Sequence, residues 1–266
     1  MALPVRPKKS LGQHFLRDEN IARKIVGSIN PEIPLILEVG PGMGILTRYL
    51  LDNPELDPWF LEIDRESAAF LAQHFPGIGD RLIVADFMKF DFAGFPPAEP
   101  GSKRLFTVIG NFPYNISSQI LFRVLEIRNR VEEVVGMFQK EVALRIAAPP
   151  GSKTYGILSV LLQAHYDIEY LFTVDEHVFQ PRPKVKSAVI RLRRNRDKAP
   201  SCDERLFTRV VKTAFNQRRK TLRNSLRAMI PESALPELEP FLPERPEQLG
   251  LDEFGILTGI LERHIT

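Results

Sequence analysis

The chain of 266 residues contains very little cysteine and no long apolar run. The single cysteine, Cys202, excludes an intrachain disulfide and a zinc site built on a cysteine cluster. We therefore expect a reducing, cytoplasmic setting and no metal. No apolar stretch is long enough to cross a bilayer, and the basic leader, residues 1–17, lacks the apolar segment of a secretory signal. These absences predict a soluble protein without a membrane partner, whose leader is either a binding arm or a disordered tail.

The overall composition is that of a globular chain, with 44% hydrophobic and 26% charged residues. The net charge of +3 is small, but its distribution is uneven. Residues 181–230 contain sixteen Lys or Arg against three acids, whereas residues 231–266 contain two Arg and eight acids. This asymmetry indicates either a surface that faces a polyanion or a basic helix that is simply solvated.

Apolar strand-like runs alternate with segments of helical periodicity over the first half of the chain. The strands are expected at residues 35–39, 59–63, 82–85, 105–110 and 131–138. The helices are expected at residues 18–29, with Asp18 as N-cap, and at 45–51, 65–74 and 117–125. Such alternation predicts an α/β fold, a Rossmann-like and mostly parallel sheet with helices on both faces.

The second half of the chain predicts an edge to this sheet and then a small helical domain. Residues 156–164 have a helical pattern, while 166–174 and 188–192 are expected to form an antiparallel edge. A charged linker at 193–202 precedes a basic amphipathic helix near residues 206–215, and five prolines interrupt the remainder. We therefore expect a methyltransferase-type domain over residues 1–195 and an all-helical domain over residues 196–266.

Three polar features follow successive predicted strands. The turn from Glu38 to Gly44 has glycines at alternate positions, with a spacing that differs from the dinucleotide pattern and fits S-adenosylmethionine better. Glu62 follows Gly40 by 22 residues, where a carboxylate can accept both ribose hydroxyl protons, and Asp86 is placed to accept an adenine amino proton. Each acid alone could instead cap a helix, a role that suits Asp64. Their occurrence in order predicts an S-adenosylmethionine site and disfavours a nicotinamide oxidoreductase.

The segment Asn111-Phe112-Pro113-Tyr114 follows the fourth predicted strand, at the carboxyl edge where open α/β sheets bind ligands. The Asn111 side-chain oxygen can accept a hydrogen bond from an exocyclic amino group, and the Tyr114 ring can stack on a flat base. The segment therefore suggests a site for an amino-bearing nucleobase. The alternative for an isolated match is an Asn-Pro turn with a buried tyrosine.

Together these features resemble the ribosomal RNA adenine N6,N6-dimethyltransferase family. The resemblance includes the leader from Lys8 to Leu16, the glycine turn, both strand-end acids and the Asn111 segment, and it continues through residues 178–189 and 215–222. It covers nearly the whole chain and implies S-adenosylmethionine as cofactor. The family more often has Asn at the position of His14 and Leu at that of Phe112. The residues that it implies for the cofactor site are His14, Leu16, Gly40, Gly42, Glu62, Asp86 and Asn111.

The acceptor chemistry needs no strong base. The lone pair of adenine N6 is delocalised, and hydrogen bonds from its protons to the Asn111 oxygen and the Phe112 carbonyl would favour a pyramidal nitrogen aligned for in-line methyl transfer. A flipped base would stack on Tyr114, with Phe179 as the candidate for its second face, unless Phe179 packs in the core. Pro113 and the prolines near Phe179 stiffen these loops. The RNA backbone is expected to contact Lys184, Lys186, Arg218, Arg219, Lys220, Arg223 and Arg227.

The family resemblance thus implies dimethylation of two adjacent adenosines near the 3′ end of small-subunit ribosomal RNA, and we expect a monomer acting on immature small subunits. Two alternatives remain within RNA biology. One is a resistance-type methyltransferase that acts on large-subunit RNA, and the other is a non-catalytic ribosome assembly factor that retains the fold. The intact Asn111 segment argues against the assembly factor, because binding alone needs no methyl-acceptor clamp.

Overall fold

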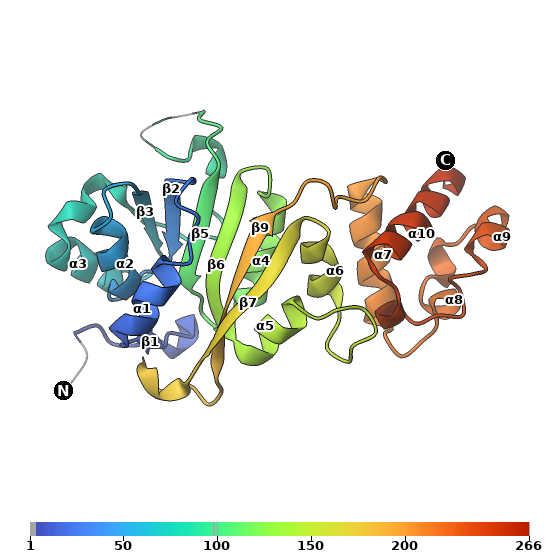
Figure 1. Cartoon of the computed structure of the whole chain (residues 1–266). Helices are drawn as coiled ribbons and strands as arrows, with labels where there is room; N and C mark the ends of the chain where they lie inside the picture. The colour runs from blue at the N-terminus through green and yellow to red at the C-terminus, as the bar shows by residue number, and fades with distance from the viewer. Residues whose placement is uncertain (1–3, 98, 100, 266) are drawn as a thin grey trace. The chain divides into compact units, whose positions relative to one another are not determined.

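The computed structural model describes residues 4–97, 99 and 101–265 and contains a seven-stranded sheet. The strands lie in the order β4 (Leu82–Val84), β3 (Asp57–Glu62), β2 (Leu35–Val39), β5 (Phe106–Asn111), β6 (Val131–Gln139), β9 (Ser187–Arg194) and β7 (Tyr166–Val174). The first five are parallel to one another, and β9 is antiparallel to β6 (Figure 1). The predicted α/β sheet and its antiparallel edge are therefore confirmed.

Helices lie before, between and after the parallel strands and cover both faces of the sheet. They are α1 (Glu19–Val26), α2 (Ile45–Leu51), α3 (Arg65–His74), α4 (Ser117–Glu126) and α5 (Lys140–Ile146), with short 3-10 turns η1 (Lys9–Leu11), η2 (Pro76–Arg81), η3 (Phe92–Gly94) and η4 (Glu176–Val178). Figure 1 shows α1 in front of the sheet and α4 behind it. The predicted N-cap of α1 is confirmed, because the Asp18 carboxylate accepts the backbone N–H groups of Asn20 and Ile21 at 2.9 and 3.0 Å.

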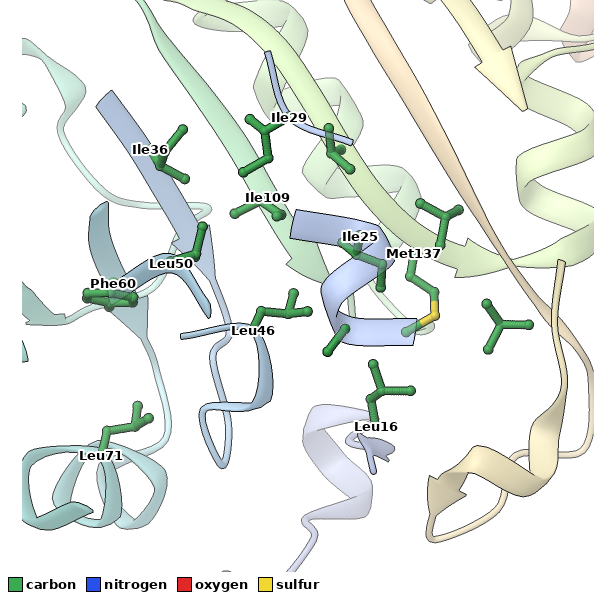
Figure 2. Packing of buried hydrophobic residues seen from close by; sticks show 14 of the residues in the cluster. Leu16, Ile25, Ile29, Ile36, Leu46, Leu50, Phe60, Leu71, Ile109 and Met137 are labelled. Carbon is green, nitrogen blue, oxygen red and sulfur yellow. The ribbon is translucent and has the colours of Figure 1, made fainter. Parts of the chain in front are cut away.

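The core between α1, α2 and the sheet is mainly aliphatic. Ile25 from α1 and Leu46 from α2 pack with Ile36 and Ile109 from the central strands, as Figure 2 shows. The leader residue Leu16 belongs to the same buried cluster. Full burial of one such side chain stabilises the fold by roughly 1.5–3 kcal/mol. The carboxyl ends of β2 and β5 are therefore held on a rigid base.

The chain forms two compact units whose limits differ from the predicted domains. One contains residues 1–143 and 168–194, and the other contains residues 144–167 and 195–266. Residues 144–167 were expected in the amino-terminal domain. They group with the carboxyl-terminal helices because Tyr155 packs against Phe215, with ring centroids 6.0 Å apart, and the Gly151 N–H donates to the Glu247 carbonyl at 2.7 Å.

The second unit is helical, as expected. It contains α6 (Ile157–Gln163), α7 (Glu204–Asn216), α8 (Leu222–Ser225), α9 (Leu235–Leu238), α10 (Leu251–His264), η5 (Arg227–Met229), η6 (Glu232–Ala234) and η7 (Pro246–Gln248). The apolar face of α7 is buried. The expected RNA-contacting residues Arg218, Arg219 and Lys220 do not belong to this basic helix, because α7 ends at Asn216 and residues 218–220 lie in the turn that follows. Among the described residues, no helix is long and apolar enough to span a membrane.

Candidate functional site

A cavity of about 380 Å³ lies at the carboxyl ends of the parallel strands. It is lined by Gly40 after β2, Glu62 at the end of β3, Asp86 after β4 and Asn111 at the end of β5, with His14 contributed by the leader. Its volume is within the range of small-molecule sites, and its place between β2 and β5 is the switch point of the strand order. The structure thus brings the predicted strand-end features together around one space.

The glycine turn uses its conformational freedom at two positions for different reasons. Gly40 has φ +68°, and a Cβ there would meet no atom within 4 Å, so this backbone faces open space on the cavity wall. Gly42 has φ +58°, and a Cβ there would lie 2.8 Å from the ring of Phe15. A side chain at Gly42 would therefore push the leader away from the turn, whereas Gly40 leaves room for a ligand.

Glu62 fixes the glycine turn while it lines the cavity. Its buried carboxylate accepts the Gly42 N–H at 2.9 Å and the Asp64 N–H at 2.8 Å, one on each oxygen. Burial raises the pKa of Glu62, and these backbone hydrogen bonds oppose that rise. Because each carboxylate oxygen has a second acceptor position, Glu62 can also accept hydroxyl protons from a ligand. Asp64 caps α3, as expected, by accepting the Glu66 N–H at 3.1 Å.

A second acid, Glu38, lies buried below the glycine turn. The Thr47 hydroxyl donates to one of its oxygens at 2.7 Å. Glu38 also lines a small void of about 30 Å³ next to Gly40, Gly42 and Asn111. Desolvation raises the pKa of Glu38 to about 8, with the neighbouring charge of Glu62 adding to the effect. From the sequence, Glu38 was expected only as the first residue of the glycine turn, without a role of its own.

Asp86 lines the cavity together with apolar residues, and one of its carboxylate oxygens accepts a backbone hydrogen bond. Its Oδ1 accepts the Met88 N–H at 2.9 Å, which fixes the turn after β4. Ile63, next to Glu62, is 49% exposed although it is large and apolar, and it lines the cavity. Together with Phe87 it provides an apolar wall suited to a flat ring. The sequence prediction missed these residues, although each directly follows a strand-end acid.

The side chain of Asn111 has a defined orientation. Its Nδ2 donates to the His14 carbonyl at 2.8 Å. A carbonyl can only accept, so the amide nitrogen must face the leader and Oδ1 must point the other way. The leader therefore orients Asn111 so that its oxygen is left to accept protons from a bound group. This is the arrangement that the acceptor chemistry requires.

Phe112 is an anchor for the loop that carries Tyr114. Its ring is buried against Phe138, with centroids 5.1 Å apart, and its N–H donates to the Met137 carbonyl at 3.2 Å. The ring fills space left by Gly136, where a Cβ would collide with it. The side chain is therefore core, and only the backbone of Phe112 is available to a substrate.

Tyr114 is half-buried at the cavity, and its ring is held at two points. Its hydroxyl hydrogen-bonds to the hydroxyl of Ser187 at the start of β9. Burial raises the pKa of Tyr114, with the Ser187 hydrogen bond acting in the opposite sense. One face of the ring is stacked on the His14 imidazole, with centroids 5.2 Å apart and planes at 27°. The tyrosine is thus neither fully buried nor free.

Two predicted site residues do not line this cavity. Phe179 is only 4% exposed and packs in the aliphatic core, because β8 (Phe179–Gln180) pairs with the leader strand β1 (Phe15–Leu16) and turns the ring inward. Its predicted role as the second face for a base is therefore wrong in this conformation, and the core alternative holds. Leu16 is buried in the same cluster and lines only the small void beside Glu38.

The leader already contacts the rest of the first unit before residue 8, because Val5 is buried and the Arg6 N–H donates to the Glu66 carboxylate at 3.2 Å. The Lys8 ammonium pairs with the buried Asp64 carboxylate, and the same carboxylate accepts the Gln13 amide at 3.3 Å. The charge of Lys8 is therefore neutralised by a carboxylate of the same chain. Leader residues 10–15, which run from η1 to β1, form part of the cavity wall.

The predicted RNA-contacting cations divide into two groups. Lys186 pairs with Asp175 at 2.6 Å, Arg223 with Glu239 at 2.8 Å, and Arg218 lies 3.7 Å from Glu247. The others are exposed and have no acid partner among the described residues: Lys184, Arg219, Lys220 and Arg227. The second group carries the charge that is available to a polyanion.

Comparisons with known proteins agree over nearly the whole chain. The family model for ribosomal RNA adenine dimethylase matches residues 5–239. Proteins named ribosomal RNA small subunit methyltransferase A are 52% identical in Parabacteroides distasonis, over 98% of this chain and 96% of the relative, and 53% identical in Cytophaga hutchinsonii, over 97% and 98%.

Two solved structures share the fold. A dimethyladenosine transferase from Plasmodium falciparum superposes with a TM-score of 0.76 at 23% identity, covering 92% of this chain and 96% of that one. The 23S rRNA methyltransferase ErmE superposes with a TM-score of 0.66 at 27% identity, covering 93% of this chain and 99% of that one.

Proposed function

Because the chain belongs to the ribosomal RNA adenine dimethylase family, we propose that it dimethylates N6 of two adjacent adenosines near the 3′ end of small-subunit ribosomal RNA. The observation that carries this proposal is the Asn111 amide, whose nitrogen is bound by the His14 carbonyl so that its oxygen is left as an acceptor beside the cavity. The full-length similarity to proteins named for the small subunit supports that choice of RNA.

The cavity residues fit S-adenosylmethionine as the cofactor. Glu62 would accept the ribose hydroxyl protons, Asp86 the adenine amino proton, and Ile63 would pack against the adenine ring. The open space above Gly40 leaves room for the rest of the molecule. When bound, the cofactor supplies a methyl group activated by a sulfonium. The Gly42 N–H donates a hydrogen bond to the Glu62 carboxylate, so the glycine turn is preformed for the ligand.

The protein's part in the chemistry is to bind and orient the acceptor amine. In the first transfer Asn111 Oδ1 and the Phe112 carbonyl accept its two protons, which favours a pyramidal nitrogen with a directed lone pair. The alkylated nitrogen then releases one proton to solvent, and in the second transfer one of these two oxygens accepts the proton that remains. Tyr114 stacks on the base, and such stacking is worth roughly 1–3 kcal/mol. That offsets much of the few kcal/mol needed to unstack an adenosine from RNA. The gain comes from orientation and electrostatics, and no catalytic base is required.

RNA binding outside the pocket would be electrostatic. Lys184, Arg219, Lys220 and Arg227 are exposed without acid partners among the described residues, and they would contact phosphates and make binding salt-dependent. Lys186, Arg218 and Arg223 would first have to exchange a carboxylate for a phosphate. We infer that the partner is an immature small subunit, that the enzyme acts as a monomer, and that it works in the cytoplasm.

The proposed function is tested with RNA and mass spectrometry. Purified protein is incubated with S-adenosylmethionine and either unmethylated small-subunit particles or large-subunit RNA, and the digested RNA is analysed for N6,N6-dimethyladenosine. We expect two dimethylated adenosines near the 3′ end of the small-subunit RNA and none in the large-subunit RNA. Modification of the large-subunit RNA alone would favour the resistance-type activity. Binding to small subunits without any methylation would favour an assembly factor.

A further inference from the structure

The His14 side chain touches the acceptor residues in a way that the proposed function does not use. Its imidazole lies against the Tyr114 ring, with centroids 5.2 Å apart and planes at 27°. Its Nδ1 donates to the Pro181 carbonyl at 2.7 Å, since a carbonyl can only accept. Its own carbonyl receives the Asn111 amide. One leader residue therefore contacts both groups assigned to the acceptor base.

We propose that His14 is a positioning residue for the acceptor adenine, holding the Tyr114 ring from the face opposite to the one on which the base stacks. The inference rests on the proposed function. A centroid distance of 5.2 Å is that of two rings in direct contact, so no base can lie between them. The base is thereby restricted to the remaining face of Tyr114.

The imidazole is suited to this task because it is itself held in place. The hydrogen bond to the Pro181 carbonyl fixes the plane of the ring, and pairing of β1 with β8 fixes the backbone directly after His14 and directly before Pro181. The Tyr114 hydroxyl is tied separately to Ser187. With its edge and one face constrained, Tyr114 presents the other face in a single orientation.

Three substitutions separate the ring from the hydrogen bond. His14→Phe keeps an aromatic face and loses the donor, His14→Asn keeps a donor toward Pro181 and loses the ring, and His14→Ala loses both. The backbone carbonyl that orients Asn111 is present in all three. An aromatic pair is worth a change of about two- to tenfold in an equilibrium. We expect kcat/KM for RNA to fall by about this factor in His14→Asn and His14→Ala, and by less in His14→Phe.

Two readouts distinguish this role from a merely structural one. Calorimetric Kd values for S-adenosylmethionine are measured for wild type, His14→Phe and His14→Asn, because His14 lines the cofactor cavity, and the loss of kcat/KM for RNA in His14→Asn should exceed any change in the cofactor Kd. In a Tyr114→Leu background, which has no ring for His14 to support, His14→Asn should cause no further loss. The predicted result is therefore a rescue by Phe together with a non-additive double mutant.

The outcomes also separate this inference from the proposed function. If the wild-type protein dimethylates small-subunit RNA but His14→Asn and His14→Phe lose activity equally, the ring does not position Tyr114. The inference is likewise overturned if the two substitutions are additive, or if the whole loss follows the cofactor Kd. A wild-type protein without any adenine methylation would instead contradict the proposed function.

Discussion

Glu38 should make the stability of the first unit depend on pH. The carboxyl is fully buried, receives the Thr47 hydroxyl at 2.7 Å, and has its pKa raised to about 8 by desolvation. The perturbation is Glu38→Gln, which keeps an oxygen to accept the Thr47 hydrogen bond and cannot ionise. The exposed Glu55→Gln is the matched control for loss of one carboxyl.

The sign and size follow from proton linkage. Below the unfolded pKa of about 4.5 both states hold the Glu38 proton, so stability there is unaffected. As pH rises, the unfolded chain releases the proton and the folded protein keeps it until about pH 8, so wild-type stability falls over this window. At about 1.4 kcal/mol per pKa unit the loss is at most roughly 5 kcal/mol. Between pH 4.5 and 8, the free energy of unfolding of Glu38→Gln should therefore rise relative to that of the wild type by this amount.

The assay is urea unfolding followed through the single tryptophan, Trp59, which is buried in β3 and reports on the first unit. Free energies of unfolding are compared at half-unit steps from pH 5 to 8.5 for the wild type, Glu38→Gln and Glu55→Gln. The difference between Glu38→Gln and wild type should grow steadily with pH. A difference that is constant with pH would refute a protonated Glu38, and growth of the same size in Glu55→Gln would show that the effect is not specific.

Two further predictions use matched pairs. Gly136→Ala should destabilise the first unit by about 1–3 kcal/mol in urea unfolding, because the new Cβ would collide with the Phe112 ring. The control Gly259→Ala adds a Cβ in open space and should not destabilise α10. Equal destabilisation by the two substitutions would contradict the tight packing of Phe112 against Gly136. Arg219→Ala should lower the salt-dependence slope of RNA binding by about 0.7–0.9, as expected for one lost phosphate contact. Arg223→Ala should lower this slope by less, because the Arg223 guanidinium is already paired with a carboxylate. A larger change for Arg223→Ala would mean that Arg223, and not Arg219, contacts the RNA backbone.

The strand-end features could be predicted because each is local. A strand that ends in a glycine turn, or in Glu62, places its last residues at the carboxyl edge of a parallel sheet whatever the rest of the chain does. Neighbouring strands then bring Gly40, Glu62, Asp86 and Asn111 to one cavity. Asp18 and Asp64 were also predictable as caps, since capping depends on the next two or three residues only.

What the sequence could not predict depends on long-range contacts. Pairing of the leader with β8 decides that Phe179 faces the core, and neither segment alone contains that information. The stacking of His14 on Tyr114 joins residues 100 positions apart. The assignment of residues 144–167 to the second unit likewise depends on packing between Tyr155 and Phe215. Ion pairs with acids distant in the sequence also occupy some of the basic residues that were expected to contact RNA.

The central claim is that the Asn111 oxygen binds the acceptor amine. The most direct measurement is the single-turnover rate of methyl transfer to small-subunit RNA by Asn111→Ala, set beside the Kd of the same variant for that RNA. The account predicts a rate lower by about 10²–10³-fold, the usual cost of losing one group that stabilises the transition state, with the Kd changed by no more than about threefold. Full activity in Asn111→Ala, or a loss of RNA binding that accounts for the lower rate, would contradict it.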